Sequence, residues 1–211
     1  MNLLLNLSIF FFAVIIHEYA HGWVAWKLGD STARFMGRLT LNPLAHIDPI
    51  GTIFLPLILL ITHSPVLFGW AKPVPVDFFN LKNPKQGMIW VGLAGPVANI
   101  LFAIALSLLL KFCRGQACLS PTVNYLIVSV ITTAIMANLV LAVFNLLPIP
   151  PLDGSRVMMG LLPYNLSVEY AKIEPYGFII IFALLWMNAI NTVIWPVVIS
   201  LARLLGVNFG M

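Results

Sequence analysis

The amino-acid sequence predicts an all-α integral membrane protein, and three observations carry this prediction. The chain has 211 residues, of which 61% are hydrophobic and only 9% are charged. Its mean hydropathy of +0.99 is far above that of a water-soluble domain of this length. The hydrophobic stretches extend from end to end, so we expect residues 1–211 to form one membrane domain with no separate soluble half.

Five hydrophobic blocks set the expected membrane topology, because about 20 apolar residues cross a bilayer as a helix. The blocks at residues 3–26, 89–110 and 125–147 each predict one spanning helix. The last block, residues 176–205, contains Pro196 and is too long for one straight helix, so it is either a kinked span or a helix followed by a re-entrant piece. We expect a polytopic bundle of about 4–6 transmembrane helices.

The second block, residues 50–70, is interrupted by Pro56, His63 and Pro65, and can enter and leave the membrane on one side. Residues 34–41, which precede it, alternate loosely between polar and apolar side chains and contain Gly37. This pattern predicts a short membrane-embedded or interfacial β-hairpin or re-entrant segment between the first and third blocks.

The charged residues indicate how the chain is oriented. Its 11 basic and 7 acidic residues lie mostly at the ends of apolar blocks, which is typical of topology signals and excludes a nucleic-acid partner. Basic residues on both sides of the second block place those flanks in the cytoplasm and the N-terminus outside. We expect a multi-pass protein of the plasma membrane, whose first 16 residues are not a cleaved signal. In the outer loop, Cys113 and Cys118 either pair or remain thiols.

The first block contains the run HEYAH, in which His17, Glu18 and His21 form the pattern His-Glu-x-x-His. On a helix the two histidines lie one turn apart and can bind one zinc ion, with Glu18 beside the open coordination position as a general base. His17 lies roughly 21 Å along the helix from the start of the block, compared with about 30 Å of hydrocarbon. The metal would therefore lie within the membrane, nearer its inner face. The alternative, polar residues that only bond neighbouring helices, leaves such costly groups unexplained.

A hydrolytic zinc site needs a third protein ligand. Asp153 is the strongest candidate, because it closes the run NLLPIPPLDG, whose prolines break the preceding helix and allow the chain to turn. Its alternative role is that of a helix N-cap. Asp30 follows a glycine turn, and for His46 and Asp48, in a proline-rich connection, we expect turn roles.

Four motifs in order, HEYAH, GWAKPVP, AGPVAN and NLLPIPPLDG, resemble the site-2 protease family of intramembrane zinc metalloproteases, peptidase family M50, in a compact form without a PDZ or CBS domain. The resemblance implies one Zn²⁺ per chain, with His17, His21 and Asp153 as its ligands and Glu18 as the general base. It also implies that Asn145 lies beside the scissile peptide bond. For Asn99, in the third motif, we expect a packing role between helices.

The predicted function is therefore that of a zinc-dependent endopeptidase that cleaves within or near a transmembrane segment of a membrane protein, with the lipid bilayer as its surroundings. The alternative is a divalent metal-ion transporter, although outside the proposed site the apolar blocks contain almost no carboxylates or histidines for an ion path. A peptidase of the prenyl-protein type would use glutamate as its third ligand, and an inactive scaffold would not need Glu18. The physiological substrate, the regulator and the oligomeric state stay open.

Overall fold

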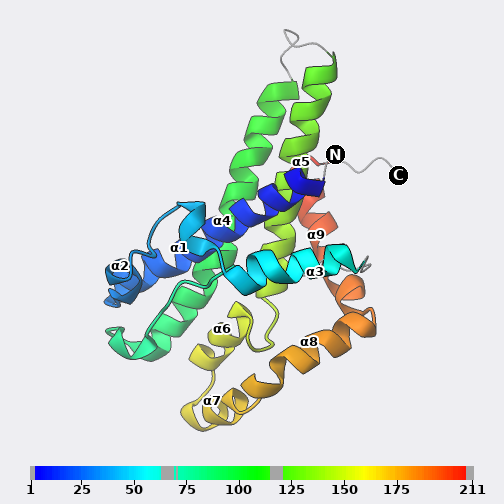
Figure 1. Ribbon diagram of the computed structural model, residues 1–211. Coiled ribbons are helices and arrows are strands. Elements are labelled where there is room, and N and C mark those ends of the chain that lie inside the picture. The colour runs from blue at the N-terminus through cyan, green and yellow to red at the C-terminus, as the bar shows by residue number, and fades with distance from the viewer. Residues whose placement is uncertain (1–2, 63–68, 70, 115–120, 208–211) are drawn as a thin grey trace.

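The computed structural model describes residues 3–62, 69, 71–114 and 121–207, and all regular secondary structure in this part is helical. Three helices are long and apolar enough to cross a membrane: α1 (Leu3–Leu28), α4 (Pro84–Arg114) and α5 (Pro121–Asn145). Helices α4 and α5 run antiparallel beside each other, and α1 packs against both (Figure 1). The prediction of a helical membrane protein is confirmed, since no strand occurs in the described ranges.

The second and last hydrophobic blocks form shorter helices than a full crossing requires, so only three of the expected 4–6 spans are found among the described residues. In the second block, a π-helical segment (Pro49–Phe54) continues into α3 (Leu55–Ile61). The last block divides into α8 (Gly177–Trp186) and α9 (Ala189–Leu204). The break lies at Asn188, which has a φ of 58°, a left-handed conformation that asparagine tolerates.

The predicted β-hairpin at residues 34–41 is wrong. This region begins with α2 (Thr32–Phe35), and Gly37, with a φ of 65°, follows its end. Two hydrogen bonds close the helix: Gly37 N–H donates to the Arg34 carbonyl, and Arg38 N–H donates to the Ala33 carbonyl. This is the Schellman arrangement, in which a left-handed glycine terminates a helix. Gly37 is thus a helix stop, which the loose alternation of side chains concealed.

The remaining helices are short and connect or cap the long ones. They are the 3₁₀ turns Pro43–His46, Phe78–Asn80 and Glu174–Tyr176, together with α6 (Asp153–Leu161) and α7 (Tyr164–Ala171). The question of whether Cys113 pairs with Cys118 involves a position outside the described residues, and so do His63 and Pro65, which interrupt the second block.

The main apolar core lies where α4, α5 and α9 meet. Its buried members are Ala103, Leu110, Ile131, Ile135, Leu139, Ile194, Val198, Ala202 and Val207. By contrast, large apolar side chains on the outer faces of the long helices are exposed, for example Phe10, Leu101 and Phe112. A bundle with an apolar core and an apolar surface suits a lipid environment, where outward leucine and phenylalanine side chains carry no hydration cost.

Helix α6 packs against α4, and this contact brings Asp153 into the bundle. The approach is close because α4 has a glycine at the contact: a Cβ atom on Gly92 would lie 3.0 Å from the Asp153 carbonyl oxygen and 3.2 Å from the Arg156 Cβ atom. A side chain at residue 92 would push the two helices apart. The start of α6 is therefore held beside the part of α4 that faces α1.

Candidate active site

His17 and His21 project from α1 into the interior of the bundle, where both are buried. They are four residues apart, so one helical turn stacks them on the same face. Their ring centroids lie 4.6 Å apart, and the rings meet edge to face at 79°. The arrangement predicted from the spacing within HEYAH is therefore present as two neighbouring imidazoles.

Asp153 reaches the same point from the first turn of α6. Its Oδ2 atom lies 2.9 Å from Nε2 of His17 and 3.2 Å from Nε2 of His21. One ligand atom from each of these three residues falls within 4.8 Å of the others, and no other metal-binding cluster of this kind is found among the described residues. Two imidazoles and one carboxylate form a donor set suited to Zn²⁺, with a fourth position left for water or substrate.

The space in front of the two histidines depends on a glycine in α4. A Cβ atom on Gly95 would lie 2.4 Å from Nε2 of His21 and 2.6 Å from Nε2 of His17. The same Cβ atom would lie 2.6 Å from Cε1 of His17, so any side chain at this position would clash with both imidazole rings. Glycine at residue 95 therefore allows α4 to lie against the two histidines.

Each histidine is also held from behind, through its Nδ1 atom. Nδ1 of His21 lies 2.7 Å from the carbonyl oxygen of Val91, and Nδ1 of His17 lies 2.7 Å from Oδ1 of Asn99. These oxygens accept hydrogen bonds, so both Nδ1 atoms carry the proton and both Nε2 atoms are left to bind a metal. Asn99 thus contacts a site residue, whereas we expected only a packing role for it.

Glu18 lies beside the three-donor cluster in a pocket of about 330 Å³, which Asn145 also lines. Its Oε2 atom accepts a hydrogen bond of 2.8 Å from the backbone N–H of Val74. At the end of α5, the Asn145 side-chain amide donates to the carbonyl of Leu141, at 3.0 Å. The predicted base and the predicted substrate-binding amide therefore share one cavity with the metal-binding residues.

Val74 belongs to a connector without regular structure, and Arg38 holds this connector in place. The Arg38 guanidinium donates to the carbonyl oxygens of Lys72, at 2.8 Å, and Pro73, at 3.3 Å. Because Lys72 and Pro73 directly precede Val74, Arg38 helps to fix the amide that Glu18 accepts from. The bond between Glu18 and Val74 joins residues 56 positions apart, and the motif GWAKPVP, which contains Val74, was the signal in the sequence that marked this connector.

Asp30, one of the competing candidates, serves a structural role. Its carboxylate is fully buried and accepts hydrogen bonds from Thr32, from the backbone N–H of Asp77 and from the Asn80 side chain. Burial alone would raise the pKa of Asp30, but these hydrogen bonds outweigh burial and lower its pKa. The carboxylate thus joins the end of α1 to residues 77–80.

His46 and Asp48 likewise lie outside the three-donor cluster. Asp48 caps the π-helical segment by accepting from the N–H groups of Ile50 and Gly51. His46 is buried, with Nε2 2.8 Å from the carbonyl oxygen of Thr40. Both residues occupy the turn roles expected for a proline-rich connection.

Comparison with known proteins agrees with this geometry. The family model described as Peptidase family M50 matches residues 6–188. The chain is 40% identical over 183 residues to "Putative zinc metalloprotease YwhC" of Bacillus subtilis, covering 86% of this chain and 80% of that protein. It is 30% identical over 179 residues to "Putative zinc metalloprotease Rip2" of Mycolicibacterium smegmatis, covering 85% of this chain and 65% of that protein.

A more distant relative is "Zinc metalloprotease MJ0392" of Methanocaldococcus jannaschii, 25% identical over 152 residues, which are 72% of this chain and 32% of that protein. No solved structure matches the chain. The family match covers most of the sequence and includes the residues of the three-donor cluster on α1 and α6. The chain belongs to peptidase family M50, the site-2 protease family of zinc metalloproteases.

Proposed function

We propose that this chain is a zinc-dependent endopeptidase that cleaves a peptide bond within or next to a transmembrane segment of another membrane protein. The observation that supports this best is the meeting of three metal-binding side chains beside Glu18, between helices long enough to span a bilayer. In this proposal the protein is multi-pass in the plasma membrane, with its site nearer the cytoplasmic face.

His17, His21 and Asp153 would hold one zinc ion per chain through Nε2, Nε2 and Oδ2. When bound, zinc supplies a Lewis acid that polarises a peptide carbonyl and lowers the pKa of a bound water to about 7. The three protein donors leave a coordination position open, as hydrolysis requires.

Glu18 would act as the general base. It lies one residue from His17 and faces the same pocket, so its carboxylate can accept a proton from the attacking water and deliver it to the leaving amine. The Val74 N–H already engages Oε2. We therefore assign proton transfer to Oε1, with the Val74 contact fixing the direction in which that oxygen points.

Asn145 would orient the substrate. One N–H of its side-chain amide donates to the Leu141 carbonyl in this structure, and an amide nitrogen carries two N–H groups. The second can donate to a substrate carbonyl that enters the shared pocket. A hydrogen bond to developing negative charge contributes roughly 3–4 kcal/mol in other hydrolases.

A transmembrane substrate must be locally unwound before it is cleaved, because a helix keeps its carbonyl groups in internal hydrogen bonds. The pocket of about 330 Å³ accommodates a short extended segment of chain and not a whole helix. We therefore expect substrates with helix-breaking residues near the cleaved bond.

A metal-ion transporter is the less favoured alternative. Transport needs several weak sites along a path. The described residues contain one cluster of three metal-binding side chains. Buried hydrogen bonds to the Nδ1 atoms hold its two histidines in place.

The proposal is tested by purifying the full chain, counting its zinc and incubating it with a model transmembrane peptide that has a helix-breaking residue at its centre. A Glu18→Gln variant is the matched control, because it keeps the shape of the side chain and removes its basicity. We expect one zinc in each protein and cleavage by the parent alone. Equal cleavage by the variant would remove Glu18 from the mechanism, and a parent without zinc would remove the proposed function.

A further inference from the structure

We propose that Asn99 is a positioning residue that fixes the tautomer and orientation of His17, and that Asn138 in turn fixes Asn99. This inference rests on the proposed function, because it takes His17 to be a metal ligand. It concerns two amides in the middle of the helical bundle, one on α4 and one on α5, which the proposed reaction does not use directly.

The two asparagines are buried, with exposed fractions of 0% for Asn99 and 1% for Asn138. An unpaired amide in an apolar interior costs several kcal/mol, whereas a hydrogen-bonded one costs much less. Nδ2 of Asn99 donates a hydrogen bond of 2.7 Å to Oδ1 of Asn138, so each amide gives the other a hydrogen-bond partner. These contacts explain how the bundle tolerates both side chains.

Two backbone carbonyls set the direction of the hydrogen bonds that connect Asn138, Asn99 and His17. Nδ2 of Asn138 donates to the Ala134 carbonyl, at 2.8 Å, which turns Oδ1 of Asn138 toward Asn99. Nδ2 of Asn99 donates to the Ala13 carbonyl, at 3.2 Å, as well as to Asn138. A carbonyl oxygen can only accept, so neither amide can be reversed without placing two acceptors against each other.

It follows that Oδ1 of Asn99 is the atom that faces His17, 2.7 Å from Nδ1. An amide oxygen cannot donate, so Nδ1 of His17 carries the proton. Nε2 is then left with a lone pair directed toward Asp153 and the metal position. Two helix carbonyls thus fix the orientation of the two asparagine amides, and these amides fix the tautomer of His17, a proposed metal ligand.

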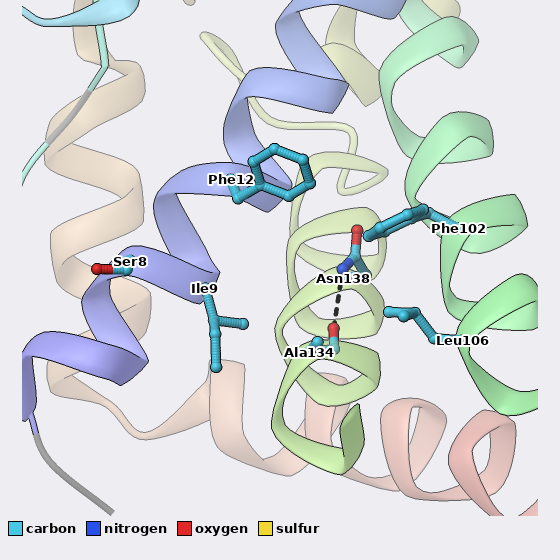
Figure 2. Close-up of a pocket in the computed structure, with 7 residues that line it drawn as sticks. All are labelled: Ser8, Ile9, Phe12, Phe102, Leu106, Ala134 and Asn138. Atoms are coloured by element: carbon cyan, nitrogen blue, oxygen red, sulfur yellow. Dashed lines mark hydrogen bonds between the residues drawn. The ribbon is translucent and has the colours of Figure 1, made fainter. Parts of the chain in front are cut away.

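Figure 2 shows the outer end of this chain of contacts. Asn138 lines a pocket of about 260 Å³ between α1, α4 and α5, and its amide nitrogen is turned along α5 toward Ala134. The other lining residues are apolar except Ser8, whose hydroxyl donates to the Leu4 carbonyl of its own helix. The described lining of this pocket therefore offers no group that competes for the Asn138 amide.

His21 provides an internal comparison. Its Nδ1 contacts the carbonyl oxygen of Val91, so its protonation is fixed by the backbone of α4 and no substitution can remove that acceptor. For His17, a side chain, that of Asn99, provides the acceptor for Nδ1. The two ligands should consequently respond differently to substitution of Asn99.

The test measures zinc affinity of the full chain by chelator competition, and the ring protons of both histidines by ¹⁵N-edited NMR of the zinc-loaded protein. For Asn99→Leu we expect zinc affinity to fall about 10–100-fold, the usual effect of losing such an outer contact. The Nδ1–H signal of His17 should shift or broaden, while that of His21 stays. Asn138→Leu should lower zinc affinity less, because Asn99 keeps its bond to the Ala13 carbonyl.

A double variant, Asn99→Leu with Asn138→Leu, separates positioning from packing. It removes both amides together, so it should recover stability that the single Asn99 variant loses, yet it should keep the loss of zinc affinity. Recovery of affinity along with stability would overturn the inference, as would an Asn99→Leu protein with the zinc affinity and the His17 proton signal of the parent.

If Asn99→Leu does not fold, the zinc-loaded parent decides alone, since an Nδ1 atom of His17 that carries no proton would overturn the inference. These outcomes leave the proposed function standing when the parent binds zinc. A parent that binds no zinc would overturn the proposed function and this inference together.

Discussion

The candidate active site has two halves: one comes from long helices, and the other comes from connecting segments and the helix start that follows one of them. In the helical half, α1 supplies His17 and His21, and α4 supplies the oxygens behind them. In the connector half, Val74 comes from an extended connection and Asp153 from the first turn after a proline-rich break. Helical spacing places the two imidazoles together by local geometry, whereas long-range packing brings in the third donor and the contact to the base.

The largest effect should follow from removing the metal-binding carboxylate of the connector half. We expect Asp153→Ala to retain two imidazoles but to lose stoichiometric zinc, a larger change than the roughly 10–100-fold caused by loss of an outer contact. Zinc content after dialysis is the measurement. Asp48→Ala is the matched control and should keep its zinc, because Asp48 caps a helical segment outside the three-donor cluster. Loss of zinc in the control alone would make Asp48, and not Asp153, the third ligand.

The next effect concerns the helical half. Gly95→Ala places a Cβ atom 2.4 Å from Nε2 of His21, so we expect zinc binding to fail and the fold to lose about 1–3 kcal/mol through overpacking. Gly87→Ala is the control, because it makes the same change in the same helix and the three atoms nearest to its Cβ all belong to the Leu81 side chain. Zinc titration and thermal unfolding of both variants test this. Normal zinc binding by the Gly95 variant would show that the space before the histidines is not needed.

A smaller effect tests the connector half at Val74. Val74→Pro removes the N–H that donates to Glu18, whereas Val74→Ala keeps it and removes similar packing. We expect the proline variant to cleave about 10–100-fold more slowly than the alanine variant, with zinc content unchanged in both. Equal rates for the two variants would mean that the Val74 amide does not orient the base.

The smallest effect tests how the connector is attached to α1. The pKa of Asp30 is lowered in the folded state, below its unfolded value of about 3.9. Its hydrogen bonds therefore stabilise the fold fully above that value, and this contribution is lost as the pH falls through the lower, folded-state pKa. Thermal unfolding should find Asp30→Asn about 1–2 kcal/mol less stable than the parent at pH 7, with a smaller difference below about pH 4. A difference that does not change with pH would contradict this assignment.

The same contrast explains how far the sequence could predict the structure. Long apolar runs predicted α1, α4 and α5, and the spacing within HEYAH predicted two adjacent imidazoles, because both depend on local periodicity. Asp153 could be identified as a candidate ligand only because the prolines before it break a helix. Nothing in the spacing of the sequence indicated its distance to His17. The placement of Asp153 required the contact of α6 with α4.

The predictions that failed or were incomplete involve residues with more than one conformational use. Gly37 suits both a bulge and a helix end, and the choice depends on the hydrogen bonds of α2. For the last block the sequence left open a kinked span or a helix with a second piece; the block divides at Asn188, and Pro196 lies inside α9. For Asn99 the expected packing role was incomplete: it bonds to α1 and α5 as expected, and it also contacts His17, which lies 82 residues away in the chain.

The central claim is that His17, His21 and Asp153 bind the same zinc ion. X-ray absorption at the zinc edge of the purified chain tests it most directly. We expect two imidazoles at about 2.0–2.1 Å with oxygen ligands completing the shell in the parent, and one imidazole in His17→Ala supplied with excess zinc. Sulfur at about 2.3 Å, or an imidazole count that His17→Ala leaves unchanged, would contradict it.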